Sequence, residues 1–209
     1  MKISILTDNR KSWILPFVDI LKNILCQNHA VEHCFNSEDI AKGDLLILLS
    51  CEKILSPKYL SLNSKNIVVH PSKLPKGKGW SPLAWQILEG KNKIPITLFE
   101  ASEEVDSGKI YIQDFIEFEG HELNEEIKKK QGEKTVEMVT SFINNIEKIN
   151  GKEQTGDESF YEKRSSKDSE LNINKSIKEQ FNLLRIVDND RYPAFFIMGG
   201  HKYLLKISR

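Results

Sequence analysis

An unbroken run of apolar residues, Leu45 to Leu49, narrows the folds open to this chain more than any other feature. Asp44 and Ser50 bound the run, so its length suits a strand rather than a helix. A strand with one face in water alternates apolar and polar residues, whereas this run offers apolar side chains to both faces. The run therefore indicates a strand inside a sheet that is covered on both sides.

The rest of the N-terminal half alternates between strand-like and helix-like segments. Strands are predicted over residues 2–7, 30–35, 44–50, 66–70 and 94–99, and helices over residues 13–25 and 81–88. Ser12 is predicted to cap the first helix, and Pro82 lies in the first turn of the second, which ends before Gly90. This alternation predicts an α/β, Rossmann-like fold, with a mostly parallel sheet, helices on both faces and a binding crevice beyond the carboxyl ends of the strands.

The C-terminal half has a different organisation. A long helix is predicted over residues 124–149, with Gly132 as a weak point, and residues 150–168 form a polar connection that could lie across the main domain. Residues 176–187 favour a helix. Gly199 and Gly200 join two strand-like runs, 193–198 and 201–207, which is a strong signal for a two-residue β-hairpin. We therefore expect a main domain at residues 1–150 and a small C-terminal extension with a helix and a hairpin at residues 151–209.

Composition limits the partners and the location of the chain. The 209 residues include 30 acidic and 30 basic ones, so no net field attracts nucleic acid or a membrane surface, and neither partner is expected. Cys26, Cys34 and Cys51 are an odd set without a CxxC spacing, and each is predicted to be a buried free thiol. No apolar run approaches the ~20 residues of a spanning helix and no secretory signal opens the chain, so a cytoplasmic location is expected.

A histidine ends one of the predicted strands, and a loop rich in proline and glycine follows it. His70 closes the strand at residues 66–70, and the loop contains Pro71, Pro75, Gly77 and Gly79. The prolines stiffen one part of the loop, whereas the glycines allow close approach to a ligand. A histidine with a carboxylate partner is the usual arrangement for acid–base chemistry near neutral pH, and Asp106 is the candidate partner. Without that partner, His70 would more often be an ordinary strand-end residue.

In their order and spacing, these residues resemble the folate-dependent formyltransferases, which include glycinamide ribonucleotide, methionyl-tRNA and sugar N-formyltransferases. The matching elements are His70, Pro71-Ser72-Lys73-Leu74-Pro75, Gly79-Trp80-Ser81-Pro82, Trp85, Ile96-Thr97 and Asp106-Ser107-Gly108. The match covers roughly residues 40 to 115. It implies a catalytic domain at residues 1–150, 10-formyl-tetrahydrofolate as the formyl donor, His70 and Asp106 as the catalytic residues, and no metal.

One position departs from the family pattern. The family has an asparagine two residues before the histidine, understood to hold the developing oxyanion, but this chain has Val68, which cannot donate a hydrogen bond. Asn66 lies one side-chain repeat (~6.6 Å) further back and could substitute only if the strand bulged. The resemblance therefore preserves the roles of His70 and Asp106 but not a complete Asn-His-Asp triad. The alternatives are that another hydrogen-bond donor or a water stabilises the oxyanion, or that formyl transfer is weaker.

Formyl transfer to an amine sets the chemistry that such a site must perform. The site has to stabilise an oxyanion, accept a proton from the attacking nitrogen and deliver one to the leaving folate nitrogen. Protonated His70 could face the oxyanion while Asp106 maintains that charge state, and preorganised donors of this kind contribute ~3–4 kcal/mol each. The resemblance implies donor contacts, largely through the main chain, from residues 52–55 and 100–106. The residues expected to bind the donor are Lys53, Leu55, Ser102, Glu103, Val105 and Asp106.

The acceptor is inferred from residues outside this match. Residues 7–13 lack the glycine turn of the glycinamide ribonucleotide enzymes, and the chain is short and neutral compared with the tRNA enzymes. The C-terminal half instead resembles sugar N-formyltransferases, closest to those of pseudaminic-acid-type pathways. The resembling strings are Phe160-Tyr161-Glu162-Lys163-Arg164, Lys167-Asp168-Ser169, Asn182-Leu183-Leu184-Arg185 and Arg191-Tyr192-Pro193-Ala194-Phe195. The expected acceptor is a nucleotide-linked amino deoxysugar of a surface-glycan precursor.

The acceptor contacts and the remaining alternatives complete the sequence-based expectations. Residues expected to bind the acceptor are Arg10, Lys11, Ser72, Lys76, Lys78, Trp80 and Arg164. Arginines with aromatic neighbours suit a diphosphate and a stacked base, although Tyr192 and Phe195 would more often be core residues. The alternatives are another small amine as acceptor, hydrolysis of the formyl donor, and a folate- or nucleotide-binding module with impaired catalysis. An exposed hairpin edge would also allow a homodimer.

Overall fold

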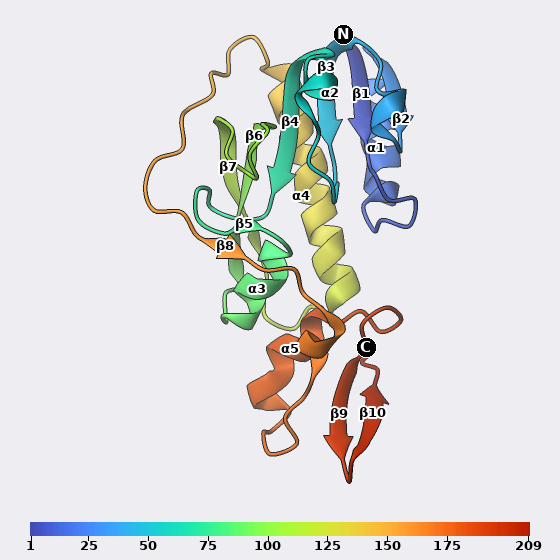
Figure 1. Cartoon of the computed structure of the whole chain (residues 1–209), viewed down its shortest axis with the longest axis vertical. Helices are drawn as coiled ribbons and strands as arrows, with labels where there is room; N and C mark the ends of the chain where they lie inside the picture. The colour runs from blue at the N-terminus through green and yellow to red at the C-terminus, as the bar shows by residue number, and fades with distance from the viewer.

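The computed structural model describes all residues from Met1 to Arg209 and is built around one six-stranded sheet (Figure 1). The strands follow the order β2-β1-β3-β4-β6-β7 across the sheet. Their bounds are β1 (Lys2–Leu6), β2 (Ala30–Cys34), β3 (Gly43–Leu48), β4 (Asn63–His70), β6 (Lys93–Glu100) and β7 (Ile110–Glu117). The run that the sequence analysis singled out is β3, which lies between β1 and β4 inside the sheet.

The sheet is mostly parallel, as predicted, but its far side reverses. β1 pairs in parallel with β2 and β3, and β3 pairs in parallel with β4. β6 then runs antiparallel to β4, and β7 runs antiparallel to β6. β7 was not predicted from the sequence, because its mixture of apolar and polar residues belongs to a half-exposed edge strand. Because of this reversal, the loop between β6 and β7 starts beside the middle of β4, at Asn66 and Ile67, three to four residues before His70.

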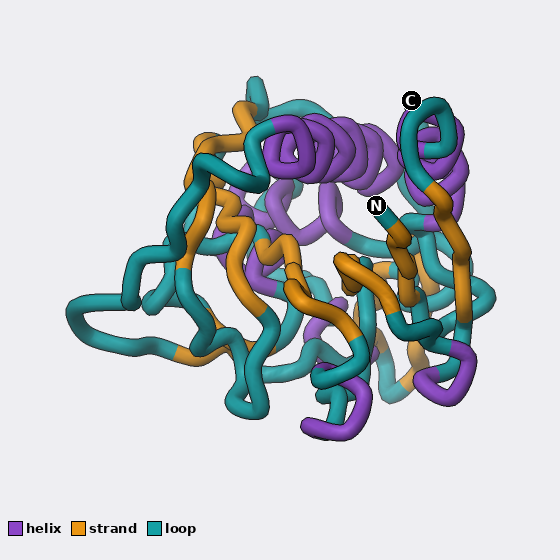
Figure 2. Tube along the Cα trace, turned by 90° about the horizontal axis from the view of Figure 1, so that it is seen from above, coloured by secondary structure: helices purple, strands orange, loops and turns teal.

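Helices cover both faces of the sheet, as predicted, but unequally. The helices are α1 (Leu15–Leu25), α2 (Pro57–Leu60), α3 (Pro82–Leu88), α4 (Asn124–Asn144) and α5 (Phe181–Ile186). Side chains such as Ile5 and Ile47 pack with α1 and α4 in the main core, whereas Leu6 and Leu46 face a smaller cluster that includes residues of α2. Figure 2 shows the long helices on one side of the strands and short helical turns on the other. The face with little helical cover leaves space beside the carboxyl ends of the strands.

Several local predictions are corrected by the structure. α1 begins at Leu15 with Ile14 at its N-cap position, and Ser12 instead donates a hydrogen bond from its hydroxyl to Ser50 Oγ at 3.1 Å. Gly132 is not a weak point, since a Cβ there would lie 2.4 Å from the ring of Phe17. The glycine therefore permits the close packing of α4 on α1. All three cysteines are free thiols, as predicted, but only Cys34 is buried, whereas Cys51 is partly exposed and Cys26 is exposed.

The segment after α4 runs along the β7 side of the molecule and returns to the main sheet region (Figure 1). There β8 (Phe160–Tyr161) pairs in parallel with the short strand β5 (Lys78–Gly79). The segment predicted to be helical at residues 176–187 contains a 3-10 turn, Lys178–Gln180, followed directly by α5. The predicted hairpin is confirmed as β9 (Ala194–Met198) and β10 (His201–Leu205). Gly199 and Gly200 both have positive φ, as a type I′ turn requires.

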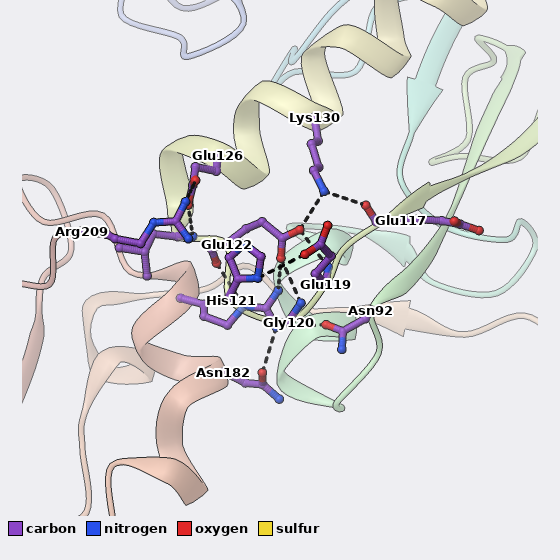
Figure 3. Close-up of polar contacts among 12 residues, drawn as sticks. Asn92, Glu117, Glu119, Gly120, His121, Glu122, Glu126, Lys130, Asn182 and Arg209 are labelled. Atoms are coloured by element: carbon purple, nitrogen blue, oxygen red, sulfur yellow. Dashed lines mark hydrogen bonds and ion pairs between the residues drawn. The ribbon is translucent and has the colours of Figure 1, made fainter.

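A buried ion-pair network fastens α5 to the main sheet region. Arg185 and Glu122 are 1% and 3% exposed, and their charged groups lie 3.3 Å apart. Arg185 also donates to Asn92 Oδ1 at 3.0 Å. Lys130 Nζ lies 2.7 Å from Glu122 Oε1 (Figure 3). Burial alone would raise the pKa of Glu122. The hydrogen bonds from Lys130 and from backbone amides outweigh burial and hold this pKa at about 2.

None of the helices has both the length and the apolar character needed to cross a lipid bilayer.

Candidate active site

His70 lies at the carboxyl end of β4, where β4 and β6 pair without irregularity. Its side chain is buried, and Nε2 lies 2.8 Å from the carbonyl oxygen of Gly77. The same nitrogen lies 3.6 Å from Oδ2 of Asp106. Because a carbonyl and a carboxylate both accept hydrogen bonds, Nε2 carries a hydrogen in either charge state of the imidazole. The structure therefore brings the two predicted catalytic side chains together, although they are far apart in the sequence.

Asp106 lies in the loop between β6 and β7 and has a left-handed backbone with φ of 49°. Aspartate is one of the few residues besides glycine that adopt this conformation readily. Its Oδ2 accepts a hydrogen bond from the backbone N–H of Gly79 at 2.8 Å, and its carbonyl accepts one from Gln154 Nε2 at 2.8 Å. The carboxylate is thus fixed by the loop that follows His70, while its backbone is fixed by a residue of the later segment.

His70 and Asp106 line a cleft of about 940 Å³. One group of lining residues comes from the strands β3, β4 and β6 and from the loops that follow β3 and β6. It includes Leu48, Lys53, Leu55, Val68, Phe99 and Val105. A second group comes from the start of α1, from α4 and from the C-terminal extension, and includes Trp13, Gln131, Lys163, Arg164, Arg191 and Tyr192. No cluster of three His, Cys, Asp or Glu side chains with metal-binding geometry occurs in the chain.

Most residues expected to contact the donor lie at the cleft. Lys53, Leu55, Ser102, Val105 and Asp106 line it, whereas Glu103 is exposed outside it. The loop that carries Lys53 is held by Asp8, whose Oδ2 accepts hydrogen bonds from the backbone N–H groups of Glu52 and Lys53 at 2.8 and 2.9 Å. Asp8 was missed by the sequence analysis. Its only signal was an aspartate in the turn directly after the first strand.

The residues expected to contact the acceptor are more scattered. Trp80 and Arg164 line the cleft, whereas Arg10, Lys11, Ser72, Lys76 and Lys78 do not. Ser72 and Lys78 are buried, Lys11 and Lys76 are exposed elsewhere, and the Arg10 guanidinium lies 4.3 Å from the ring centroid of Phe35. Lys78 points into the protein because its ammonium group pairs there with Glu158. Loop composition alone did not reveal that neither Lys76 nor Lys78 lines the cleft.

Charged residues of the C-terminal extension reach the cleft, and of these Arg164 was predicted to bind the acceptor whereas Lys163 and Arg191 were not. Lys163 Nζ lies 3.1 Å from Glu52 Oε2 and 4.3 Å from the ring centroid of Trp80. The hydrogen bond from Lys163 lowers the pKa of Glu52, and the charge of Arg191 contributes to the same shift. Arg164 donates to the Asp168 carbonyl at 3.1 Å, and burial lowers the pKa of its guanidinium. The site is therefore completed by charged residues of the C-terminal extension.

Val68 lies on the same side of β4 as His70, and both residues line the cleft. Asn66 does not replace the missing amide, because its Nδ2 donates to the carbonyl of Leu60 at 3.0 Å. The paired residues of β4 from Ile67 to His70 also show no bulge that would move Asn66 forward. The side chain two positions before the histidine is therefore apolar within the cleft.

Comparisons with known proteins point to one family. The model of the family described as "Formyl transferase" matches residues 21–143. The methionyl-tRNA formyltransferase of Thermotoga neapolitana is 30% identical over 160 residues, which cover 75% of this chain and 51% of that protein. This chain thus spans about half the length of that relative.

Two solved structures extend the comparison to the whole chain. A sugar N-formyltransferase from Shewanella sp FDAARGOS_354 has a TM-score of 0.73 at 15% identity, covering 100% of this chain and 97% of that one. HypX from Aquifex aeolicus, in complex with tetrahydrofolic acid, has a TM-score of 0.81 at 20% identity, covering 99% of this chain and 37% of that one. At these identities the two structures establish a shared fold.

Proposed function

Because this chain belongs to the formyl transferase family, we propose that it is a folate-dependent N-formyltransferase acting on a nucleotide-linked amino deoxysugar. The formyl donor would be 10-formyl-tetrahydrofolate, and the acceptor would be a primary amine of the sugar. The observation that carries the proposal is the convergence of His70 and Asp106, 3.6 Å apart, at the wall of a cleft. Both residues lie within the part of the chain that matches the family.

The cleft suits a folate donor in size and in lining. Its volume of about 940 Å³ lies near the upper end of the usual range for small-molecule sites, roughly 300–1,000 Å³. Leu48, Leu55, Val68 and Phe99 give one part of the cleft an apolar lining that suits a flat ring. The structural similarity to HypX with bound tetrahydrofolic acid supports the same donor class. The folate would supply the formyl group, carried on its nitrogen.

His70 has the features of a proton-transfer group. Its Nε2 is committed to the carbonyl of Gly77 and to Asp106, whereas its Nδ1 has no hydrogen-bond partner in the protein. Nδ1 is therefore the nitrogen at which the imidazole gains or loses a proton. Asp106 lies on the Nε2 side of the ring, 3.6 Å away, and so leaves Nδ1 free for the exchange. These two residues would move the proton that the attacking amine must lose.

The cleft lining also supports a nucleotide sugar as the acceptor. Lys163, Arg191, Trp80 and Tyr192 place two cations and two exposed aromatic side chains in the cleft. Cations suit a diphosphate, and aromatic faces suit a nucleotide base. The sugar N-formyltransferase among the structural neighbours agrees with this assignment.

A second acceptor is favoured by one specific observation. The sequence relative that shares 30% identity is a methionyl-tRNA formyltransferase. A tRNA acceptor would require contacts with phosphates, which basic surfaces usually supply, whereas this chain carries 30 basic and 30 acidic residues. We therefore rank aminoacyl-tRNA below the nucleotide sugar and include it in the test.

The C-terminal hairpin supports a homodimer. Residues Ile197, Met198, Tyr203 and Leu204 are exposed apolar side chains on a two-stranded sheet. β10 pairs only with β9, so its outer backbone edge is open. Such an edge with apolar side chains is an aggregation hazard unless another strand or surface covers it. A second copy of the same chain, bound through this hairpin, would cover it on both molecules.

Direct assay of the purified full chain tests the proposed function. The chain would be incubated with 10-formyl-tetrahydrofolate and one acceptor at a time. The acceptors are UDP- and dTDP-linked amino sugars, small amines, and charged initiator tRNA. We expect mass spectrometry to detect the gain of one formyl group on an amino sugar. His70→Ala should lower the turnover by roughly 100- to 10,000-fold, the usual contribution of a proton-transfer group.

The control for that variant is His29→Ala, since His29 lies at the opposite ends of the parallel strands, away from the cleft. It should leave the turnover unchanged. Formylation of tRNA without formylation of any sugar would select the second acceptor. Folate binding without a formylated product across the whole panel would instead identify a binding module with impaired catalysis, an outcome consistent with Val68.

A further inference from the structure

The loop that follows His70 is completed by residues that lie about eighty positions further along the chain. Ser159 accepts a hydrogen bond from the Gly77 N–H through its hydroxyl and from the Lys78 N–H through its carbonyl, both at 2.9 Å. Trp80 N–H donates to the carbonyl of Tyr161 at 3.0 Å. Residues 154–161, which we name the clamp segment, therefore hold the backbone of the loop that contacts both catalytic side chains.

Gln154 of the clamp segment holds the turn that carries Asp106. Its Nε2 donates to the carbonyls of Asp106 and Gly108, both at 2.8 Å. The turn is tightly packed, since a Cβ on Gly108 would lie 1.8 Å from the carbonyl oxygen of Glu100. Asp106 also has a left-handed backbone, which few side chains favour. Gln154 thus fixes the conformation from which the Asp106 carboxylate reaches Gly79 and His70.

Lys78 joins the two catalytic loops to the clamp segment. It is 1% exposed, and its ammonium group donates to Ser107 Oγ at 2.9 Å and forms an ion pair with Glu158. Its neighbours in the chain are Gly77, whose carbonyl contacts His70, and Gly79, whose N–H donates to Asp106. A buried ammonium group needs such partners, because an unpaired charge in the interior is strongly unfavourable. One side chain therefore connects three segments that are distant in the sequence.

We propose that Lys78, Glu158 and Gln154 are positioning residues that hold Asp106 in reach of His70. The inference rests on the proposed function for its catalytic readout. None of the three side chains lines the cleft, so they act through Asp106 and the loop rather than on a substrate. A misplacement of about 1 Å in a catalytic group can cost roughly 100-fold in rate. The clamp segment therefore supports the catalytic pair, although it lies dozens of residues after Asp106 in the sequence.

Kinetic analysis of full-length variants tests the clamp. Lys78→Met removes the contacts of Lys78 with Ser107 and Glu158, and Gln154→Met removes both hydrogen bonds from Gln154 to the Asp106 turn. Glu158→Gln removes only the charge that pairs with Lys78. We expect kcat to fall roughly 10- to 100-fold, with KM values for donor and acceptor changed by less than about twofold. The double variant of Lys78 and Glu158 should be no slower than Lys78→Met alone, because the two residues form one pair.

Matched controls separate positioning from general destabilisation. Lys73→Met and Asp157→Asn alter exposed neighbours in the same two segments and should retain the wild-type kcat. Glu158 is half-exposed and Gln154 is partly exposed, so their variants carry the test if Lys78→Met fails to fold. Wild-type kcat in both Glu158→Gln and Gln154→Met would overturn the proposal. A loss confined to KM would overturn it as well.

A second readout does not depend on catalysis. The ring resonances of His70 and His29 can be compared by NMR between wild-type protein and Gln154→Met at one pH. Displacement of Asp106 from its place 3.6 Å from the His70 ring should change the chemical shifts of His70 but not those of His29. If the wild-type protein forms no formylated product, the proposed function fails, while altered His70 chemical shifts in the variant still support the clamp. Unchanged His70 chemical shifts would refute the clamp whether or not the protein is active.

Discussion

Removing the charge of Glu122 should destabilise the protein in a way that depends on pH. Its carboxylate accepts hydrogen bonds from Lys130 and from the backbone N–H groups of Glu119 and Gly120, and it pairs with Arg185. All four partners donate hydrogen bonds. In a glutamine at position 122 one carboxylate oxygen is replaced by an NH2 group, which is also a donor and would face at least one of these partners. Glu122→Gln therefore breaks a buried pair and leaves Arg185 without its counter-charge.

The magnitude follows from the pKa of this carboxyl group. Its ordinary value is 4.5, and the folded protein lowers the pKa to about 2. That difference corresponds to roughly 3 kcal/mol of folding free energy at neutral pH, in line with the roughly 3–5 kcal/mol typical for breaking a buried ion pair. Since the folded-state pKa is depressed, the stabilisation is complete above about pH 4.5 and is lost as the pH falls toward 2.

Urea unfolding at a series of pH values measures this contribution. At pH 7 we expect Glu122→Gln to lower the free energy of unfolding by about 3 kcal/mol. The gap to the wild type should narrow below pH 4.5, because the carboxyl group of the unfolded wild-type chain then binds a proton, and the folded one does so as the pH approaches 2. Glu119→Gln, an exposed neighbour, serves as the control and should change stability by less than about 0.5 kcal/mol. A gap that stays constant with pH, or one below about 1 kcal/mol at pH 7, would refute the assignment.

Two further predictions concern the cleft and the hairpin. Val68→Asn would place an amide donor two residues before His70, and we expect kcat to rise roughly tenfold or more. If the formylation assay shows no gain, another hydrogen-bond donor already stabilises the oxyanion. Leu204→Glu places a charge on the exposed face of β10 and should convert a dimer to a monomer, as measured by sedimentation equilibrium. A wild-type chain that sediments as a monomer at high concentration would exclude the hairpin dimer.

The sequence alone was sufficient for the features that depend on local patterns. The apolar run Leu45–Leu49 predicted a strand in the sheet interior, and Gly199-Gly200 predicted the hairpin turn. The spacing of His70 and Asp106 within a familiar motif predicted the pair that the fold brings to 3.6 Å. The first two signals are local because burial of a strand and a positive φ each leave a mark on neighbouring residues, whereas the third came from the resemblance to a known family.

Only the tertiary structure decided which distant residues support that pair. Lys78 was expected at the acceptor, yet it turns inward because Glu158, eighty positions later, supplies its counter-charge. Gln154 gave no recognisable signal, and the string that contains Arg185 did not identify Glu122 as its partner. A single polar residue does not indicate which distant part of the chain will become its partner. The antiparallel entry of β6 was equally hidden, because strand direction depends on how the connecting loop folds. Long-range partners are chosen by packing of the whole chain, and short stretches of sequence carry no record of that choice.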